Sequence, residues 1–118
     1  MARLNGVPCI KVDVTRGLPF SDHTFDLVYT DALLEHFPSP EQILKELFRV
    51  SKKYVLSIVP RDIFLNNLLT AITKPPKEYK RMDTEWLELH RAFKPASIKA
   101  ETSMLLNLII LCEVNKLE

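Results

Sequence analysis

Short apolar runs rich in β-branched and aromatic residues alternate along the chain with segments whose apolar residues recur at helical spacing. Runs of the first kind predict buried strands, and segments of the second kind predict helices with one apolar face. The predicted strands are residues 8–14, 25–29, 54–59 and 104–114. Strands that alternate with helices are typical of an α/β sandwich with a mostly parallel sheet and flanking helices.

The clearest predicted helix follows Ser39, a residue type that is favoured as an N-cap. Pro40 suits the first helical position, and Gln42 completes the S-x-x-Q pattern of a capping box. The helix is expected to end at residues 51–53. Its predicted apolar stripe is Ile43, Leu44, Leu47 and Phe48.

The other predicted helices are less regular. A helical turn capped by Asp31 is expected over residues 32–35, and it must stop before Pro38. Residues 78–93 are predicted to form a loop or short helix at one sheet edge. A short helix over 95–103 would leave only one strand to close the C-terminal end. A further helix is predicted over 62–73, with Ile63, Phe64, Leu68, Leu69 and Ile72 buried.

Composition and charge narrow the class of protein. The chain has 118 residues, 47% of them hydrophobic, which fits one soluble globular domain at most. A formal net charge of +1 gives no reason to expect nucleic acid or an anionic membrane as a partner. No apolar run reaches the roughly 20 residues of a membrane helix, and the N-terminus lacks a signal-peptide core. We therefore expect a cytoplasmic protein.

The positions of the cysteines and glycines argue against several kinds of binding site. Cys9 and Cys112 each lie in an apolar, strand-like stretch, so both are expected to be buried thiols, with a disulfide or metal role as the alternative. No residues are assigned as metal ligands. The only two glycines, Gly6 and Gly17, are far apart in sequence, whereas loops that cradle nucleotides need clustered glycines. This absence argues against a nucleotide-binding oxidoreductase.

One stretch carries a more specific pattern. Asp13 is followed by Gly17-Leu18-Pro19-Phe20-Ser21-Asp22, Phe25-Asp26-Leu27-Val28 and Leu34-Glu35-His36-Phe37, and then by Glu46, Arg49-Val50 and a strand that ends at Pro60. In order, spacing and residue type this stretch resembles the central part of class I S-adenosylmethionine (SAM)-dependent methyltransferases of the small-molecule "type 11" branch. The chain resembles the C-terminal portion of that domain.

The resemblance implies a partial Rossmann-like sandwich, in which residues 1–118 form a single, incomplete domain. It also implies transfer of a methyl group from SAM to an unknown small-molecule acceptor. The family's first strand, glycine-rich loop and second strand have no counterpart in the sequence, so binding of SAM by this chain alone is in doubt. The family's strand order would place the missing strands between residues 8–14 and 25–29, leaving a gap with unpaired backbone groups in the sheet.

The resemblance also implies site residues. Asp13 and Leu18 correspond to the adenine side of the cofactor, and Thr30 and Asp31 lie where methionine and acceptor meet. For Asp13, capping of the turn at residues 15–17 remains the alternative. For Leu18, the alternative is a place in the core.

Three further residues are candidates for catalysis. His36 has the pKa range of a general base, and Glu35 precedes it. Packing of both side chains beneath the loop is the alternative. His90 belongs to a segment that lies over the substrate entrance in some relatives, although a surface or lid histidine is the simpler reading.

Three explanations of the missing elements remain open. The chain is a fragment that is inactive alone, or a partner chain completes its sheet and restores the enzyme. The third is a pseudo-methyltransferase, a non-catalytic interaction or regulatory module that forms a homodimer or pairs with another chain.

Overall fold

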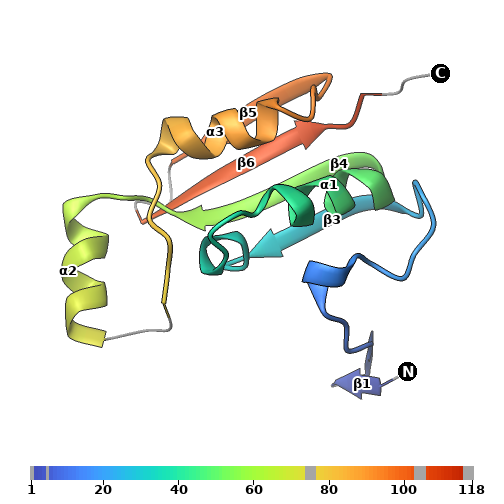
Figure 1. The fold of residues 1–118 in the computed structure, drawn as a ribbon, viewed down its shortest axis with the longest axis horizontal. Coiled ribbons are helices and arrows are strands. Elements are labelled where there is room, and N and C mark those ends of the chain that lie inside the picture. Colours follow the sequence, from blue (N-terminus) through green and yellow to red (C-terminus); the bar gives the residue numbers. More distant parts are fainter. Residues whose placement is uncertain (1, 5, 74–76, 103–105, 116–118) are drawn as a thin grey trace.

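A four-stranded sheet forms the centre of the computed structural model, which describes residues 2–4, 6–73, 77–102 and 106–115. The strands follow the order β3-β4-β6-β5 (Figure 1), with β3 at Phe25–Asp31, β4 at Ser51–Pro60, β5 at Ser97–Glu101 and β6 at Asn107–Glu113. The pair β3–β4 is parallel, and the pairs β4–β6 and β5–β6 are antiparallel. The α/β class is therefore confirmed, but the prediction of a mostly parallel sheet was wrong.

The parallel pair is joined by helix α1, Glu41–Val50, as a crossover between parallel strands requires. Pro40 occupies the N-cap position without a side-chain cap, so the predicted capping box of Ser39 and Gln42 does not form. The predicted apolar stripe is confirmed, since Ile43, Leu44 and Leu47 are buried and Phe48 packs against the core. Strand β4 begins directly at Ser51, with no turn between it and the helix.

The C-terminal end contains two strands, where the sequence indicated a helix and one strand. Within β5 only Ile98 packs against the core and the other residues are exposed, as suits a strand at a sheet edge. The backbone of β5 pairs with β6 from Ser97↔Glu113 to Glu101↔Ile109. The short connection from β5 to β6 favours an antiparallel pair. Strand β6 also pairs with β4 in the antiparallel direction, so two of the three strand pairs are antiparallel.

Helix α3, Asp83–Arg91, packs beside α1 on the same face of the sheet (Figure 1). Trp86 of α3 is fully buried. The core between the two helices and the sheet consists of Leu34, Ile43, Leu44, Leu47, Val55, Val59, Trp86, Leu108, Ile110, Cys112 and Val114.

The opposite face of the sheet is not covered by any described helix. Leu27, Tyr29 and Tyr54 point to this face and retain 49%, 63% and 39% of their exposure. Over the residues described, the protein therefore has two layers, one of helices and one of sheet. The outer face of the sheet carries exposed apolar side chains.

The N-terminal segment lies outside the sheet. Strands β1, Ala2–Leu4, and β2, Val7–Cys9, form a separate antiparallel pair away from the sheet (Figure 1). The predicted strand 8–14 therefore ends at Cys9, and Val14–Arg16 is a 3-10 turn, η1. The predicted gap in the sheet centre was also wrong: among the residues described, β3 is an edge strand whose one partner is β4.

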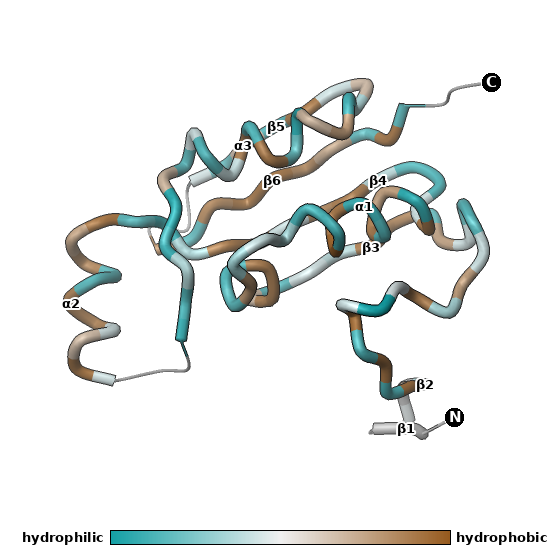
Figure 2. The backbone as a smooth tube through the Cα atoms, viewed as in Figure 1, coloured by the Kyte–Doolittle hydropathy of each residue, from teal (hydrophilic) through white to brown (hydrophobic). Residues whose placement is uncertain are grey.

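Helix α2, Phe64–Thr73, confirms a predicted helix but not its predicted burial. Phe64 is 81% exposed and Ile72 is 69% exposed. Figure 1 shows that α2 projects from the end of the sheet instead of crossing its face, and Figure 2 shows its hydrophobic turns in brown. No helix in the described ranges is long and apolar enough to cross a membrane.

Cys9 and Cys112 differ in burial. Cys112 is buried as predicted, and burial raises the pKa of its thiol to about 11. Cys9 is only partly buried, so the prediction of a buried thiol was wrong for this residue.

Candidate functional site

The carboxyl ends of β3 and β4, where ligands bind in parallel α/β sheets, meet at Asp31 and Ile58. Beyond Asp31 the chain turns at Ala32, whose φ of 59° is unusual for a residue other than glycine. The Ala32 amide donates a hydrogen bond of 3.1 Å to the Ile58 carbonyl and fixes this turn to β4. The 3-10 turn η2, Leu34–His36, follows; its N-cap is Leu33, so Asp31 does not cap it.

Thr30 and Asp31, both predicted to lie near the reacting centre, differ in burial. Thr30 is buried, and its Oγ1 has no hydrogen-bond partner in the structure. Asp31 is exposed at the end of the strand. A buried hydroxyl without a partner is uncommon in folded proteins.

Glu35 and His36 lie on η2 beside this strand end. Glu35 is 2% exposed, and its Oε1 has no hydrogen-bond partner. His36 Nε2 lies 3.7 Å from Glu35 Oε2, and His36 Nδ1 lies 3.0 Å from the Lys77 carbonyl oxygen. The structure therefore brings these two residues together with a strand end and with a segment more than forty positions away.

The pKa of Glu35 is raised, chiefly because burial disfavours the charged carboxylate. The nearby carboxylates of Glu78 and Asp31 raise it further, while a backbone hydrogen bond and His36 lower it. This end of the sheet therefore concentrates negative charge around a buried carboxyl group.

A small cavity of about 100 Å³ lies next to this cluster, beyond the end of β4. Two of its lining residues carry buried polar atoms without partners, Asn67 Oδ1 and Trp86 Nε1. Arg61 closes one side through an ion pair of 3.1 Å to Asp83, and the Arg81 guanidinium lies 5.0 Å from the centre of the Trp86 ring. This cavity could not be predicted from local sequence patterns, because its lining residues come from separate segments.

Asp13 lies outside this cluster. Its Oδ1 accepts hydrogen bonds from the Thr15 amide at 3.0 Å and the Thr15 hydroxyl at 2.6 Å, and its Oδ2 lies 3.5 Å from Arg16 Nε. The hydrogen bonds from Thr15 lower the pKa of Asp13. The carboxylate therefore caps η1, as the alternative interpretation expected.

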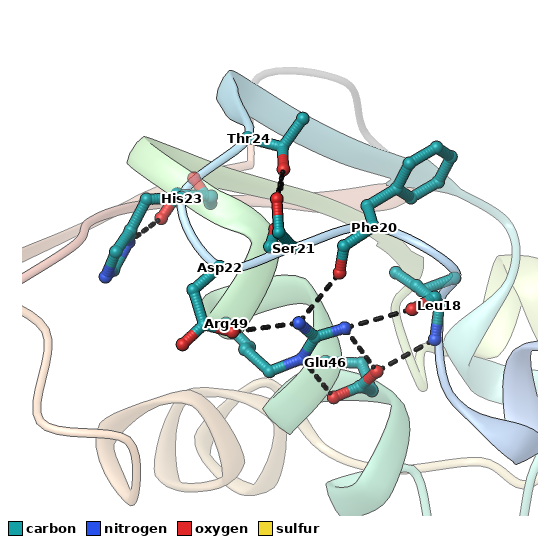
Figure 3. Close-up of polar contacts among 9 residues, drawn as sticks. Leu18, Phe20, Ser21, Asp22, His23, Thr24, Glu46 and Arg49 are labelled. Carbon is teal, nitrogen blue, oxygen red and sulfur yellow. Dashed lines mark hydrogen bonds and ion pairs between the residues drawn. The ribbon is translucent and has the colours of Figure 1, made fainter.

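Leu18 belongs to a loop that is tied to α1 by an ionic network (Figure 3). The Leu18 amide donates to Glu46 Oε1 at 2.8 Å, and its carbonyl accepts from Arg49 Nη2 at 3.0 Å. Arg49 Nη1 also donates to the Phe20 carbonyl at 2.8 Å and to Asp22 Oδ1 at 2.9 Å. Sequence analysis recognised Glu46 and Arg49 as motif residues but not this role; their opposite charges at i,i+3 were the available signal.

His90 is not a surface or lid residue. Its side chain is fully buried, with Nε2 2.8 Å from Ser57 Oγ and Nδ1 2.7 Å from the Trp86 carbonyl oxygen. Burial lowers the pKa of His90, so the ring is held neutral within the core. The prediction of a surface position was wrong because α3 covers the sheet at this point.

The glycines do not mark a cofactor cradle. A Cβ at Gly17 would meet Glu46 Oε1 at 3.1 Å, and a Cβ at Gly6 would meet no atom within 4 Å. Gly17 therefore leaves no room for a phosphate or nucleoside close to its backbone, whereas Gly6 lies in open space.

Comparison with known proteins agrees with the motifs. The model of the methyltransferase domain family matches residues 2–58. A Thermotoga maritima SAM-dependent methyltransferase, a possible histamine N-methyltransferase, is 19% identical; the match covers 93% of this chain and 65% of that one, with a TM-score of 0.76. A SAM-dependent methyltransferase from Aquifex aeolicus is also 19% identical, over 95% of this chain and 57% of that one, with a TM-score of 0.64.

A third similar structure is the complex between the Haloferax volcanii Trm112 methyltransferase activator and the putative methyltransferase. It is 13% identical, covers 99% of this chain and 65% of that one, and has a TM-score of 0.71. No curated protein matches the chain. The chain therefore spans less than two thirds of the length of these solved structures.

Proposed function

We propose that the chain supplies the acceptor side of a SAM-dependent methyltransferase. The premise is that residues 2–58 match the methyltransferase domain family and that the fold is shared with SAM-dependent methyltransferases. The observation that carries the proposal is the strand end at Thr30 and Asp31, with the buried Thr30 hydroxyl left without a partner. The acceptor is a small molecule of unassigned class.

In this proposal SAM is the methyl donor, and the amides that hold it come from a segment outside the 118 residues. The outer edge of β3 is where such a segment joins the sheet, because β3 pairs with β4 alone over the described part of the chain. Asp13 stays a capping residue, since both of its oxygens have partners.

Catalysis of methyl transfer needs alignment of donor and acceptor more than it needs acid–base chemistry. Thr30 and Asp31 are the positioning residues in this proposal, and Glu35 and His36 are candidates for removing a proton from the acceptor. His90 is left out because its ring is buried and held by Ser57 and Trp86.

The test is calorimetric titration with S-adenosylhomocysteine of the chain alone and of the protein purified from its native host, where an upstream segment or partner is retained. The proposal expects no saturable binding to the chain alone, although circular dichroism shows it folded. It expects binding by the native material, weakened about tenfold by Thr30→Val, the effect of one lost hydrogen bond of about 1.4 kcal/mol. Failure of the native material to bind would overturn the proposal.

A second function is favoured by the uncovered sheet face at Leu27, Tyr29 and Tyr54. Here the chain is a non-catalytic module that pairs with itself or with another protein through this face. The Haloferax volcanii complex, which contains a methyltransferase activator, supports a search for a protein partner. Self-association that Tyr29→Lys abolishes and that S-adenosylhomocysteine does not change, measured by analytical ultracentrifugation, would favour this function over the enzyme.

A further inference from the structure

Three side chains with metal-ligating atoms gather beside the end of β3. Glu35 and His36 come from η2, and Glu78 comes from the segment that precedes α3. One ligand atom from each residue lies within 4.8 Å of the other two. Atoms this close can bind one ion after small side-chain rotations, because metal–ligand bonds of about 2 Å place ligands roughly 3–4 Å apart.

The backbone fixes the two segments against each other. The Tyr79 amide donates a hydrogen bond of 2.7 Å to the Glu35 carbonyl. The His36 ring lies 3.0 Å from the Lys77 carbonyl oxygen through Nδ1. Glu78 therefore lies between two residues that are held against η2, so its position beside Glu35 and His36 is built into the fold.

The hydrogen bond to Lys77 decides the state of the His36 ring. A carbonyl oxygen only accepts hydrogen bonds, so Nδ1 must carry the proton and donate it. In a neutral ring this leaves a lone pair on Nε2, which is directed toward Glu35 Oε2 at 3.7 Å. Histidines that bind metals have this arrangement, with one nitrogen donating to a carbonyl and the other facing the ion.

Glu35 is an independent reason to expect a cation. Its side chain is 2% exposed, and Oε1 has no hydrogen-bond partner. A buried carboxylate oxygen without a partner is costly, and a bound cation removes that cost. Two basic side chains of the adjoining segment make other contacts: Lys77 Nζ lies 5.1 Å from the Tyr79 ring centre, and Arg81 donates to the Pro38 carbonyl at 2.7 Å.

We propose that Glu35, His36 and Glu78 bind a divalent transition-metal ion of the zinc or manganese class. One imidazole and two carboxylates suit these ions, whereas calcium requires six to eight oxygen ligands. Three protein ligands leave a coordination position for water or for a ligand. This inference does not depend on the proposed methyltransferase function, because it concerns only side chains of this chain.

The experiment is calorimetric titration of the chelator-treated protein with zinc chloride and, separately, with manganese and magnesium chlorides. We expect one equivalent of zinc or manganese to bind, with magnesium much weaker. Glu78→Gln and His36→Asn are each expected to weaken binding by at least about tenfold, since each removes a ligand. Cobalt chloride gives a second readout, because its visible absorption band should be lost in His36→Asn.

Two control variants remove the same chemical groups elsewhere. Glu88→Gln removes a carboxylate on α3 that pairs only with Arg91, and His23→Asn removes a histidine beside Ser51 at the opposite end of β3. Both should bind the metal like the unaltered protein. Glu78 is only half-buried, so Glu78→Gln tests the site without disturbing the core. The proposal is overturned if the folded protein binds none of the ions, or if the controls lose as much affinity as the site variants.

Discussion

Glu46 and Arg49 form a two-point ion pair across one turn of α1, with Arg49 Nε 2.7 Å from Glu46 Oε2 and Arg49 Nη2 2.9 Å from Glu46 Oε1. The pair does not act only within the helix. It holds the amide and carbonyl of Leu18 and the carbonyl of Phe20 (Figure 3). Two parts of the sequence motif that are nearly thirty positions apart are therefore one structural unit.

Replacing the buried carboxylate should release the loop from the helix. Glu46→Gln is expected to lower the free energy of unfolding by about 1–3 kcal/mol, because charge-assisted hydrogen bonds are lost at a buried position. Urea denaturation followed by circular dichroism measures this change. Glu41→Gln on the exposed face of the same helix is the control, and an equal loss in that variant would contradict the network's importance.

The ion pair between Glu46 and Arg49 also predicts that the free energy of unfolding falls in acid. Hydrogen bonds from Arg49 and the Leu18 amide lower the pKa of Glu46 to about 2 from its usual value of 4.5. Since the folded pKa is the lower one, the stabilisation is complete above pH 4.5 and is lost as the pH falls toward 2. Stability curves of the wild type and Glu46→Gln, measured from pH 7 downward, should converge below pH 4.5. Parallel curves would show that Glu46 does not titrate in this window.

Gly17 is expected to tolerate no side chain. Its φ is 92° and its ψ is 163°, and an added Cβ would lie 3.1 Å from Glu46 Oε1. Gly17→Ala should lower stability by about 1–3 kcal/mol, the cost of backbone strain in this region. Ala32→Gly is the reverse test, because Ala32 has a positive φ without being glycine. It should leave thermal stability unchanged or raised, and a similar loss in both variants would contradict this reasoning.

Buried His90 predicts a second pH effect near neutrality. Burial lowers its pKa from 6.5, so the unfolded chain binds a proton more readily than the folded chain. Its contribution to stability is therefore full above pH 6.5 and is lost as the pH falls below that value. The difference in unfolding free energy between pH 7.5 and 5.5 should be smaller in His90→Gln than in the wild type. Equal differences would show that the ring does not titrate on unfolding.

Neighbouring residues of β3 should respond in opposite ways. Val28 packs against the core, whereas Tyr29 is 63% exposed on the uncovered face. Val28→Ser is expected to cost about 1–3 kcal/mol through lost packing and a buried hydroxyl. Tyr29→Ser should change stability by less than about 0.5 kcal/mol. Thermal unfolding of both variants measures this contrast, and a large loss in Tyr29→Ser would mean that another part of the chain covers it.

The sequence was informative where local pattern and packing agree. The apolar stripe of α1 and the runs at β3 and β4 predicted elements that the structure contains. Residues 95–103 misled because a charged, mixed segment has no clear period, and its pairing with β6 is decided by a distant strand. The burial of α2 was predicted from its apolar residues alone, but a helix beyond the end of a sheet has nothing to pack on.

The site was predictable only in part. Thr30 and Asp31 end β3, and Glu35 and His36 follow on η2, so their neighbourhood could be inferred from the motif. Glu78 could not be, because it reaches η2 through backbone hydrogen bonds at Lys77 and Tyr79 that no local pattern reveals. The resemblance also placed Asp13 at a strand end, whereas its own turn binds both carboxylate oxygens.

The position of β4 between β3 and β6 has a consequence for how the chain is made. During synthesis β3, α1 and β4 leave the ribosome as a near-continuous segment and can fold early, because their contacts are close in sequence. The edge of β4 that faces away from β3 stays without a partner strand until β6 has been synthesised, after α2 and α3. A chain whose synthesis stops before residue 107 would leave exposed the edge of β4 that β6 covers in the complete fold, and exposed strand edges promote aggregation of nascent proteins.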